Sequence, residues 1–252
     1  SRPGRGVTER TGHADPPLLR AVTAEFVGTA FLLAAIVGSG IMAERLSDDE
    51  GLQLLQNAFA TAGVLTALIL ALGPASGAHF NPVVTIADWV FGGLSTSTAV
   101  AYIGAQIAGA IVGVMTANIM FDLDLVDWST KDRSAGHLVF AEGIATIGLL
   151  LVIFGVVRSG RASVAAFAVG GYIAGAYYFT SSTSFANPAV TIARMFSDTF
   201  AGIEPAGVPA FVLAQLVATA IAVALILVIY PSIGEVADRV VLPHDGGSRE
   251  EQ

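Results

Sequence analysis

Two nearly identical copies of a short motif stand in an otherwise apolar chain, at Asn81-Pro82-Val83-Val84-Thr85-Ile86-Ala87 and at Asn187-Pro188-Ala189-Val190-Thr191-Ile192-Ala193. Asn before Pro is typical of a helix start, because Asn caps the first turn and Pro at the first helical position loses no hydrogen bond. Only about 10 apolar residues follow each copy, whereas about 20 are needed to cross a bilayer. The motifs therefore predict two short helices that begin inside the membrane, with their free N–H groups facing buried protein or a water-filled path.

The composition indicates a membrane protein. Hydrophobic residues make up 54% of the chain and charged residues only 13%, against about 25% charge in a typical soluble domain. The net charge of −8 argues against a nucleic-acid partner, and the lack of cysteine excludes disulfides and thiol chemistry. Six segments are long and apolar enough to cross a bilayer, namely 21–43, 52–73, 98–120, 138–157, 162–180 and 209–231.

The two halves of the chain repeat the same markers in the same order. An Ala-Glu pair in the first span, with Glu25, recurs in the fourth span with Glu142, and an Ala-Gln pair in the third span recurs in the sixth. Because each half holds an odd number of full crossings, the second half must lie upside down relative to the first. We expect a channel domain over 18–232, with repeats at about 18–122 and 136–232, between a disordered N-terminal tail at 1–17 and a polar C-terminal tail at 233–252.

The basic residues predict an orientation. If the N-terminus is cytoplasmic, eight arginines lie inside and only Arg45, Lys131 and Arg133 lie outside. This distribution fits the positive-inside rule. We therefore expect a multi-pass protein of the cell (inner) membrane with both termini in the cytoplasm.

With two Asn-Pro motifs in an inverted six-span frame, the chain resembles the aquaporin (major intrinsic protein) family from about residue 21 to residue 230. The resemblance implies an all-α membrane protein with six transmembrane helices and two re-entrant half-helices, which form an hourglass pore. It also implies a homotetramer in the lipid bilayer and passive transport of small neutral solutes, with no cofactor, metal or enzymatic activity. The implied pore motif consists of Asn81, Pro82, Val83, Asn187, Pro188 and Ala189, with Val83 where the family usually has Ala.

The resemblance also locates a narrow selectivity filter, at Thr61, Tyr177, Ser184 and Val190. The fifth-span position falls between Gly175 and Tyr177, and Tyr177 is our choice. Val190 stands where the family usually has Arg. Because Val lacks the five donors and the charge of Arg, we expect a wider and more apolar opening that admits glycerol-like polyols.

The residues after Val190 refine this expectation. The run from Asn187 to Arg194 resembles a bacterial aquaporin subgroup associated with trivalent arsenic, whose As(OH)₃ form is a neutral, glycerol-like solute. Arg194 lies one helical turn from Val190, and we do not expect it to replace the missing Arg directly. Water, polyols and arsenous acid are the solutes that follow from the resemblance.

Some of these residues have simpler interpretations. Asn81 and Asn187 could be plain helix caps instead of pore-lining donors. Glu25 and Glu142 are charges inside spans, which by default mark function because their burial is costly, although the resemblance implies that they accept hydrogen bonds from the re-entrant loops. His79 has no second His or acidic cluster at metal-ligand spacing, so we expect it to pack behind the first motif.

Three other functions stay open at this point. The chain could be an ordinary water-selective aquaporin. It could be an ion-coupled secondary transporter, since inverted repeats and broken helices occur there too, but this would need titratable groups along the path. It could also be an intramembrane enzyme, for which no nucleophile with a base and no carboxylate pair is evident.

Overall fold

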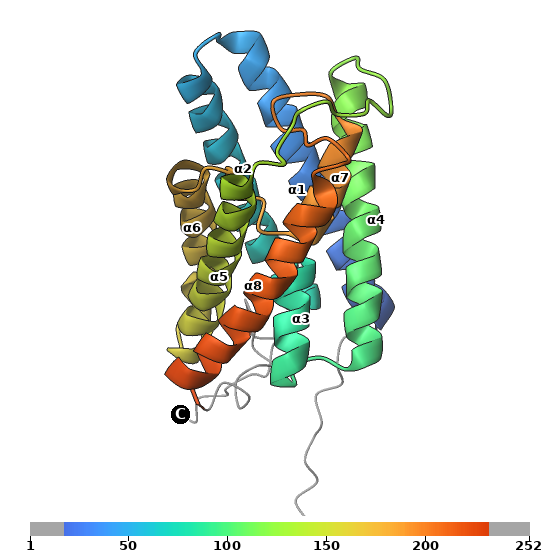
Figure 1. Cartoon of the computed structure of the whole chain (residues 1–252). Coiled ribbons are helices and arrows are strands. Elements are labelled where there is room, and N and C mark those ends of the chain that lie inside the picture. The colour runs from blue at the N-terminus through green and yellow to red at the C-terminus, as the bar shows by residue number, and fades with distance from the viewer. Residues whose placement is uncertain (1–17, 232–252) are drawn as a thin grey trace, which may run out of the picture.

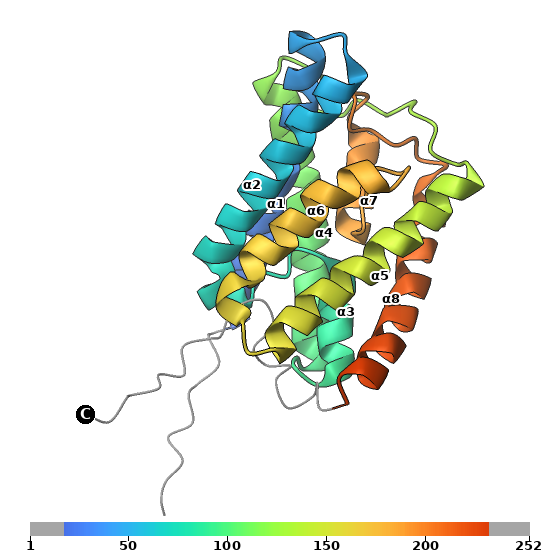
Figure 2. The same cartoon turned by 90° about the vertical axis from the view of Figure 1, so that its left-hand side faces the viewer.

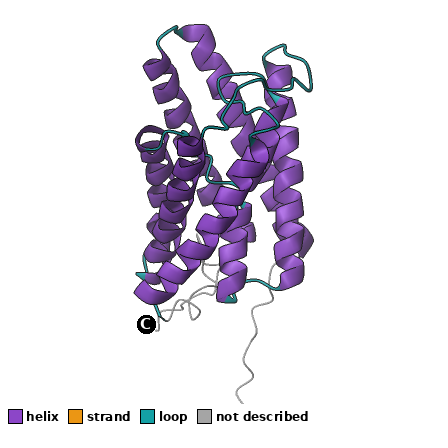
Figure 3. Cartoon of the chain, viewed as in Figure 1, coloured by secondary structure: helices purple, strands orange, loops and turns teal. Residues whose placement is uncertain are grey.

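The computed structural model describes residues 18–231, so the predicted tails at 1–17 and 233–252 lie outside the described residues. The long helices are α1 (Leu18–Leu46), α2 (Glu50–Ser76), α4 (Thr96–Met120), α5 (Gly136–Arg158), α6 (Ala165–Phe179, after the 3₁₀ turn η1, Ala162–Val164) and α8 (Val208–Ile229). The motifs open α3 (Pro82–Phe91) and α7 (Pro188–Ala193), and the 3₁₀ turn η2 (Arg194–Phe196) continues α7 (Figure 1; Figure 3). Within 18–231, six helices are long and apolar enough to cross a membrane. The predicted all-helical, six-span fold is confirmed.

The two short helices enter the bundle from opposite ends. Both views show α3 in the lower half of the bundle and α7 in the upper half (Figure 1; Figure 2). Each short helix packs against both α4 and α8, and the two contact each other. This is the arrangement expected of two inverted repeats whose broken helices meet near the middle of the membrane.

Glycines bring α1 and α4 together more closely than any other side chain would allow. A Cβ atom at Gly109 would lie 2.3 Å from the carbonyl oxygen of Phe26, and one at Gly113 would lie 2.2 Å from that of Ala30. Such contacts between small residues and a facing backbone are a main source of helix association in membranes, where burial of apolar surface gives little driving force. They position Glu25 on α1 beside the loop that leads into α3.

The second half-helix is shorter than predicted. We expected about 10 apolar residues in each half-helix, but α7 has only six residues before the chain tightens into η2. The carbonyl oxygens of Met195 and Phe196 accept hydrogen bonds from the N–H groups of Ser129 (2.9 Å) and Asp127 (3.1 Å). The loop between α4 and α5 thus takes the acceptors that a further helical turn would have used, and Arg194 stands at the bend.

Candidate functional site

Each Asn-Pro motif begins its half-helix as the sequence predicts. Asn81 and Asn187 have extended backbones, with φ of −156° and −160°, and each caps a helix whose first residue is Pro. The Oδ1 of Asn81 accepts from the N–H of Val83 at 3.0 Å, and the Oδ1 of Asn187 accepts from the N–H of Ala189 at 2.9 Å. The side-chain oxygens are therefore occupied, and the amide nitrogens point elsewhere.

The amide nitrogens join the two halves of the chain. The Nδ2 of Asn81 donates to the carbonyl oxygen of Ala186, and the Nδ2 of Asn187 donates to that of Phe80, both at 2.8 Å. Each acceptor is the residue just before the opposite Asn. Because an amide nitrogen carries two hydrogens, each Asn keeps one further donor for a group beside it.

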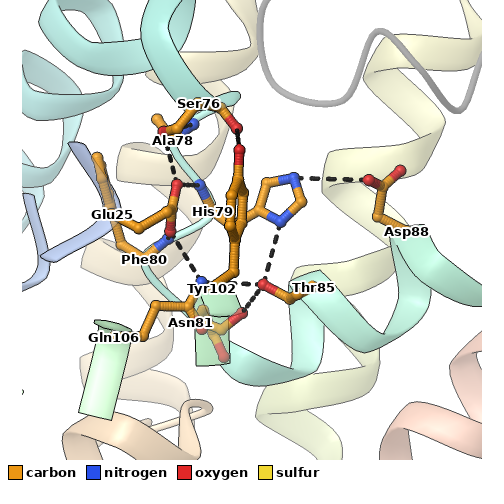
Figure 4. A network of polar contacts seen from close by, with 10 residues as sticks. All are labelled: Glu25, Ser76, Ala78, His79, Phe80, Asn81, Thr85, Asp88, Tyr102 and Gln106. Carbon is orange, nitrogen blue, oxygen red and sulfur yellow. Dashed lines mark hydrogen bonds and ion pairs between the residues drawn. The ribbon is translucent and has the colours of Figure 1, made fainter. Parts of the chain in front are cut away.

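Behind the first motif, the carboxylate of Glu25 holds the loop that leads into α3 (Figure 4). Its Oε1 accepts from the Ser76 hydroxyl at 2.6 Å and from the His79 N–H at 3.0 Å. Its Oε2 accepts from the Phe80 N–H at 2.7 Å and from the Gln106 Nε2 at 2.8 Å. Four donors satisfy the two oxygens, which is what allows a fully buried carboxyl group to be tolerated inside a span.

Glu142 makes the corresponding contacts in the second half. Its Oε1 accepts from the N–H of Phe185 and its Oε2 from the N–H of Ala186, both at 2.8 Å. Its Oε2 also accepts from the Nε2 of Gln215 at 2.7 Å, and the same nitrogen reaches the hydroxyl of Thr191 at 2.8 Å. The two predicted buried carboxylates thus hold equivalent points of the two re-entrant loops.

Both loops also share an unusual backbone. Ala78 and Phe80 have φ of 51° and 48°, and Ser184 and Ala186 have φ of 54° and 45°. A residue other than Gly in this left-handed region costs about 1–3 kcal/mol, so the surrounding contacts must hold it there. Phe80 and Ala186 are also the residues whose carbonyl oxygens accept from the opposite Asn.

One cavity brings most of the predicted site residues together. It is lined by Asn81, Asn187 and the four predicted filter residues, Thr61, Tyr177, Ser184 and Val190. Much of the remaining wall is apolar and consists of Leu32, Ile36, Leu65, Ile69, Val84, Leu149, Ile153, Val169 and Ile173. A cavity lined by a few polar groups and many apolar ones suits a small solute that bonds to the first and slides past the second.

The four predicted filter residues differ in their polar contacts. The Thr61 and Tyr177 hydroxyl oxygens lie 3.1 Å apart and share a hydrogen bond across the cavity wall. Tyr177 is buried, whereas Gly175, the other end of the range considered for the fifth span, is exposed. The buried Ser184 hydroxyl has no hydrogen-bond partner among the described residues.

The other motif residues are buried, but they are not part of this wall. Pro82, Val83, Pro188 and Ala189 lie at the starts of the two half-helices and do not line the cavity. Val83 is fully buried in the core. The side chain at this position therefore affects packing and does not contribute to the cavity wall.

Two titratable cavity residues were not predicted to lie there. His79 lines the cavity, with its Nδ1 3.1 Å from the Thr85 hydroxyl and its Nε2 3.7 Å from a carboxylate oxygen of Asp88 (Figure 4). Arg194 lines it as well. The spacing of four residues between Val190 and Arg194 was the signal for the second, because residues four apart share one face of a helix.

Comparisons with known proteins agree with this architecture. The family model for Major intrinsic protein matches residues 13–174. Aquaglyceroporin AqpS of Rhizobium meliloti (strain 1021) is 47% identical over 208 residues, which are 82% of this chain and 89% of the relative. Aquaporin-5 of Ovis aries is 32% identical over 198 residues, which are 71% of this chain and 72% of the relative.

A solved structure shares the fold. The aquaglyceroporin from Plasmodium falciparum superposes with a TM-score of 0.68 and 22% sequence identity, covering 86% of this chain and 99% of that chain. The six spans, the two half-helices and the matches in sequence all agree. The chain belongs to the major intrinsic protein (aquaporin) family, whose members are membrane channels and not enzymes.

Proposed function

We propose that this protein is a passive channel for small uncharged solutes, from water to glycerol-like polyols, with a filter that Val190 widens. The cavity that joins both Asn side chains to Thr61, Tyr177 and Ser184 carries the proposal. The 47% identical relative is an aquaglyceroporin, which supports the inclusion of polyols.

The width of the filter follows from the side chain at Val190. Val190 is buried and contributes only a short, uncharged side chain to the wall. An Arg at this position would extend a long guanidinium into the path and narrow it. With Val, a larger solute can pass and can still bond to the free hydroxyl of Ser184 and the remaining donors of the two Asn amides.

Arsenous acid fits the same description, and we include it among the proposed solutes. It is neutral at physiological pH and presents hydroxyl groups around a small centre, as glycerol does. The filter side chains are hydroxyl and apolar groups at Thr61, Tyr177, Ser184 and Val190. A filter of such groups should admit arsenous acid as readily as a polyol of similar size.

An ion-coupled transporter is the second candidate, and the placement of the carboxylates argues against it. Ion coupling through these two carboxylates would need them to lie on the path. Glu25 and Glu142 are buried away from the cavity wall, and both oxygens of each already accept hydrogen bonds. They act as anchors for the loops in this proposal.

We further propose that four protomers assemble in the cell (inner) membrane, each with its own pore and with both termini in the cytoplasm. Family membership supports the assembly. An even number of spans, six between residues 18 and 231, places the two described ends on the same side. The distribution of basic residues favours the cytoplasm for that side.

Stopped-flow light scattering on proteoliposomes tests the function. We expect flux of water, glycerol, urea and arsenous acid, each linear in solute concentration and unchanged when proton and sodium gradients are collapsed. Empty liposomes made from the same lipids are the control. Water flux without glycerol flux would favour a water-selective channel, and flux that needs an ion gradient would favour a transporter.

A further inference from the structure

Although Val190 has no charge, a guanidinium group lies in the same cavity. It belongs to Arg194. Arg194 is only 2% exposed and is among the largest fully buried side chains. It lines the same cavity as Val190, Tyr177 and Ser184. Such deep burial of a permanent charge is costly unless bonds compensate for it, so its contacts indicate what the side chain is for.

The contacts of Arg194 use only part of its bonding capacity. Its Nε donates to the carbonyl oxygen of Ala201, and its Cζ lies 3.5 Å from the centre of the Phe185 ring. Across residues 18–231, no carboxylate oxygen lies within ion-pair distance of it, and its two terminal NH₂ groups make no hydrogen bond to the protein. Because Arg has five N–H donors, four remain for groups in the cavity.

A second guanidinium stands on the same aromatic ring. Arg133 reaches in from the loop between α4 and α5, and its Cζ lies 5.0 Å from the centre of the Phe185 ring. Its nitrogens donate to the carbonyl oxygens of Gly202 (2.8 Å), Ser182 (3.2 Å) and Phe200 (3.4 Å). Arg133 therefore has a structural role, because its nitrogens hold backbone carbonyl groups of the surrounding loops. Burial lowers its pKa to about 10, which leaves it positively charged at neutral pH.

We propose that Arg194 supplies the charge of the filter from one turn beyond Val190, so that width and charge are set by different residues. Val190 opens the path for polyol-sized solutes. Arg194, with the field of Arg133 behind it, repels cations and donates hydrogen bonds to the oxygen atoms of a passing solute. The inference rests on the proposed channel function and departs from our expectation that Arg194 would not replace the missing Arg directly.

Urea and guanidinium form a suitable pair of probes, because both are planar and of similar size and only guanidinium is charged. In proteoliposomes, the unmodified protein is expected to pass urea and exclude guanidinium. Arg194→Gln keeps amide donors but removes the charge, and it should raise guanidinium flux by about tenfold or more while urea flux persists. Arg194→Lys keeps the charge and should still exclude guanidinium.

Two control variants separate the charge at Arg194 from other effects. Val190→Ala widens the path without removing charge and should leave guanidinium excluded. Arg45→Gln removes an exposed positive charge at the end of α1, outside the cavity, and should leave both urea flux and guanidinium exclusion unchanged. If Arg194→Gln fails to assemble, Ser184→Asp places a carboxylate in the same cavity beside an intact Arg194, with Ser184→Asn as its uncharged match. Ser184→Asp should admit guanidinium and Ser184→Asn should not.

The possible outcomes separate this inference from the channel proposal. If the unmodified protein passes neither urea nor glycerol, the channel proposal fails. If it passes urea and guanidinium equally, or if a folded Arg194→Gln or Ser184→Asp variant excludes guanidinium as well as the unmodified protein does, the channel proposal stands. In those cases the role assigned to Arg194 is overturned.

Discussion

At the scale of single residues, our proposal assigns the width of the filter to position 190 and its charge to position 194. Val190 is short and apolar, whereas the guanidinium of Arg194 lies over the ring of Phe185 and donates to the carbonyl oxygen of Ala201. The contact at 3.5 Å between the Cζ of Arg194 and the ring centre is a close cation–π contact, and such contacts are strongest where water is excluded. The guanidinium is thereby held in one place.

We expect Val190→Arg to reduce the flux of glycerol by about tenfold and that of water by less than about threefold, because a second guanidinium would narrow the path. Stopped-flow measurements of both solutes on the same proteoliposomes give the two ratios. Val190→Met, which adds length without charge, is the control. Equal loss of water and glycerol in a folded Val190→Arg variant would contradict a place for Val190 at the constriction.

The sequence predicted the cavity residues better than it predicted their contacts. Thr61, Tyr177, Ser184 and Val190 line one cavity, although they come from α2, α6, a loop and α7. That Arg194 lines the same cavity was not predicted, because its side chain contacts Phe185 and Ala201, which belong to other segments. Helical spacing alone contains no information about those partners.

At the scale of elements, the re-entrant loops depend on one carboxylate each. Glu142→Ala would leave the N–H groups of Phe185 and Ala186 without their acceptor. An unsatisfied buried donor costs about 1–3 kcal/mol, so we expect a loss of roughly 2–6 kcal/mol and a clear fall in the melting temperature in detergent. Glu142→Gln keeps one acceptor oxygen and should lose less.

Glu44→Ala is the matched control for this prediction. Glu44 is exposed and accepts a single hydrogen bond, from the Phe200 N–H at 3.0 Å. Its loss should cost no more than about 1 kcal/mol. A Glu142→Ala protein that melts normally but shows a new pH dependence of flux would point to a proton site of the transporter kind.

The close approach of α1 and α4 leads to a second prediction at this scale, which concerns the effect of a larger residue on stability. In Gly113→Ala, the new Cβ would lie 2.2 Å from the Ala30 carbonyl oxygen, and the backbone cannot yield as a side chain would. We expect a loss of about 1–3 kcal/mol or more, measured as thermal unfolding. Gly104→Ala on the same helix meets nothing within 4 Å and should be neutral, so equal effects would contradict the packing argument.

The elements themselves were largely predictable, because their signals are local. The six spans follow from runs of apolar residues, and both half-helices begin at their Asn-Pro caps. The end of the second half-helix was not predictable. It is set by Ser129 and Asp127, which lie far from it in the sequence and take its carbonyl oxygens.

At the scale of the whole molecule, the two halves are joined by the paired hydrogen bonds of Asn81 and Asn187. The inversion itself was predictable from the odd number of crossings in each half. The paired bonds were not, because they need Phe80 and Ala186 in a left-handed backbone, which no residue type at these positions indicates.

We expect Asn187→Asp to allow a measurable leak of protons or cations and to reduce neutral flux without abolishing it. A carboxylate would lose the donor to the Phe80 carbonyl and would attract cations to the meeting point of the two halves. Because Arg194 remains, the leak should be smaller than in Arg194→Gln. A pH-sensitive dye inside proteoliposomes measures the proton leak.

The opposite Asn provides the control for this prediction. Asn81→Asp removes the equivalent bond, to the Ala186 carbonyl at 2.8 Å, and the inverted repeat predicts a similar leak. An effect at one Asn and none at the other would contradict a shared path past both side chains.

The bond between the Asn187 amide and the Phe80 carbonyl also has a consequence for biosynthesis. The two residues are 107 positions apart in the chain. At about 5–20 residues per second of synthesis, Phe80 is made roughly 5 to 20 seconds before its partner exists. Until then the carbonyl oxygen of Phe80 lacks the donor that it has in the complete fold. Membrane insertion of the second half, and not folding of the first, therefore determines when a pore exists.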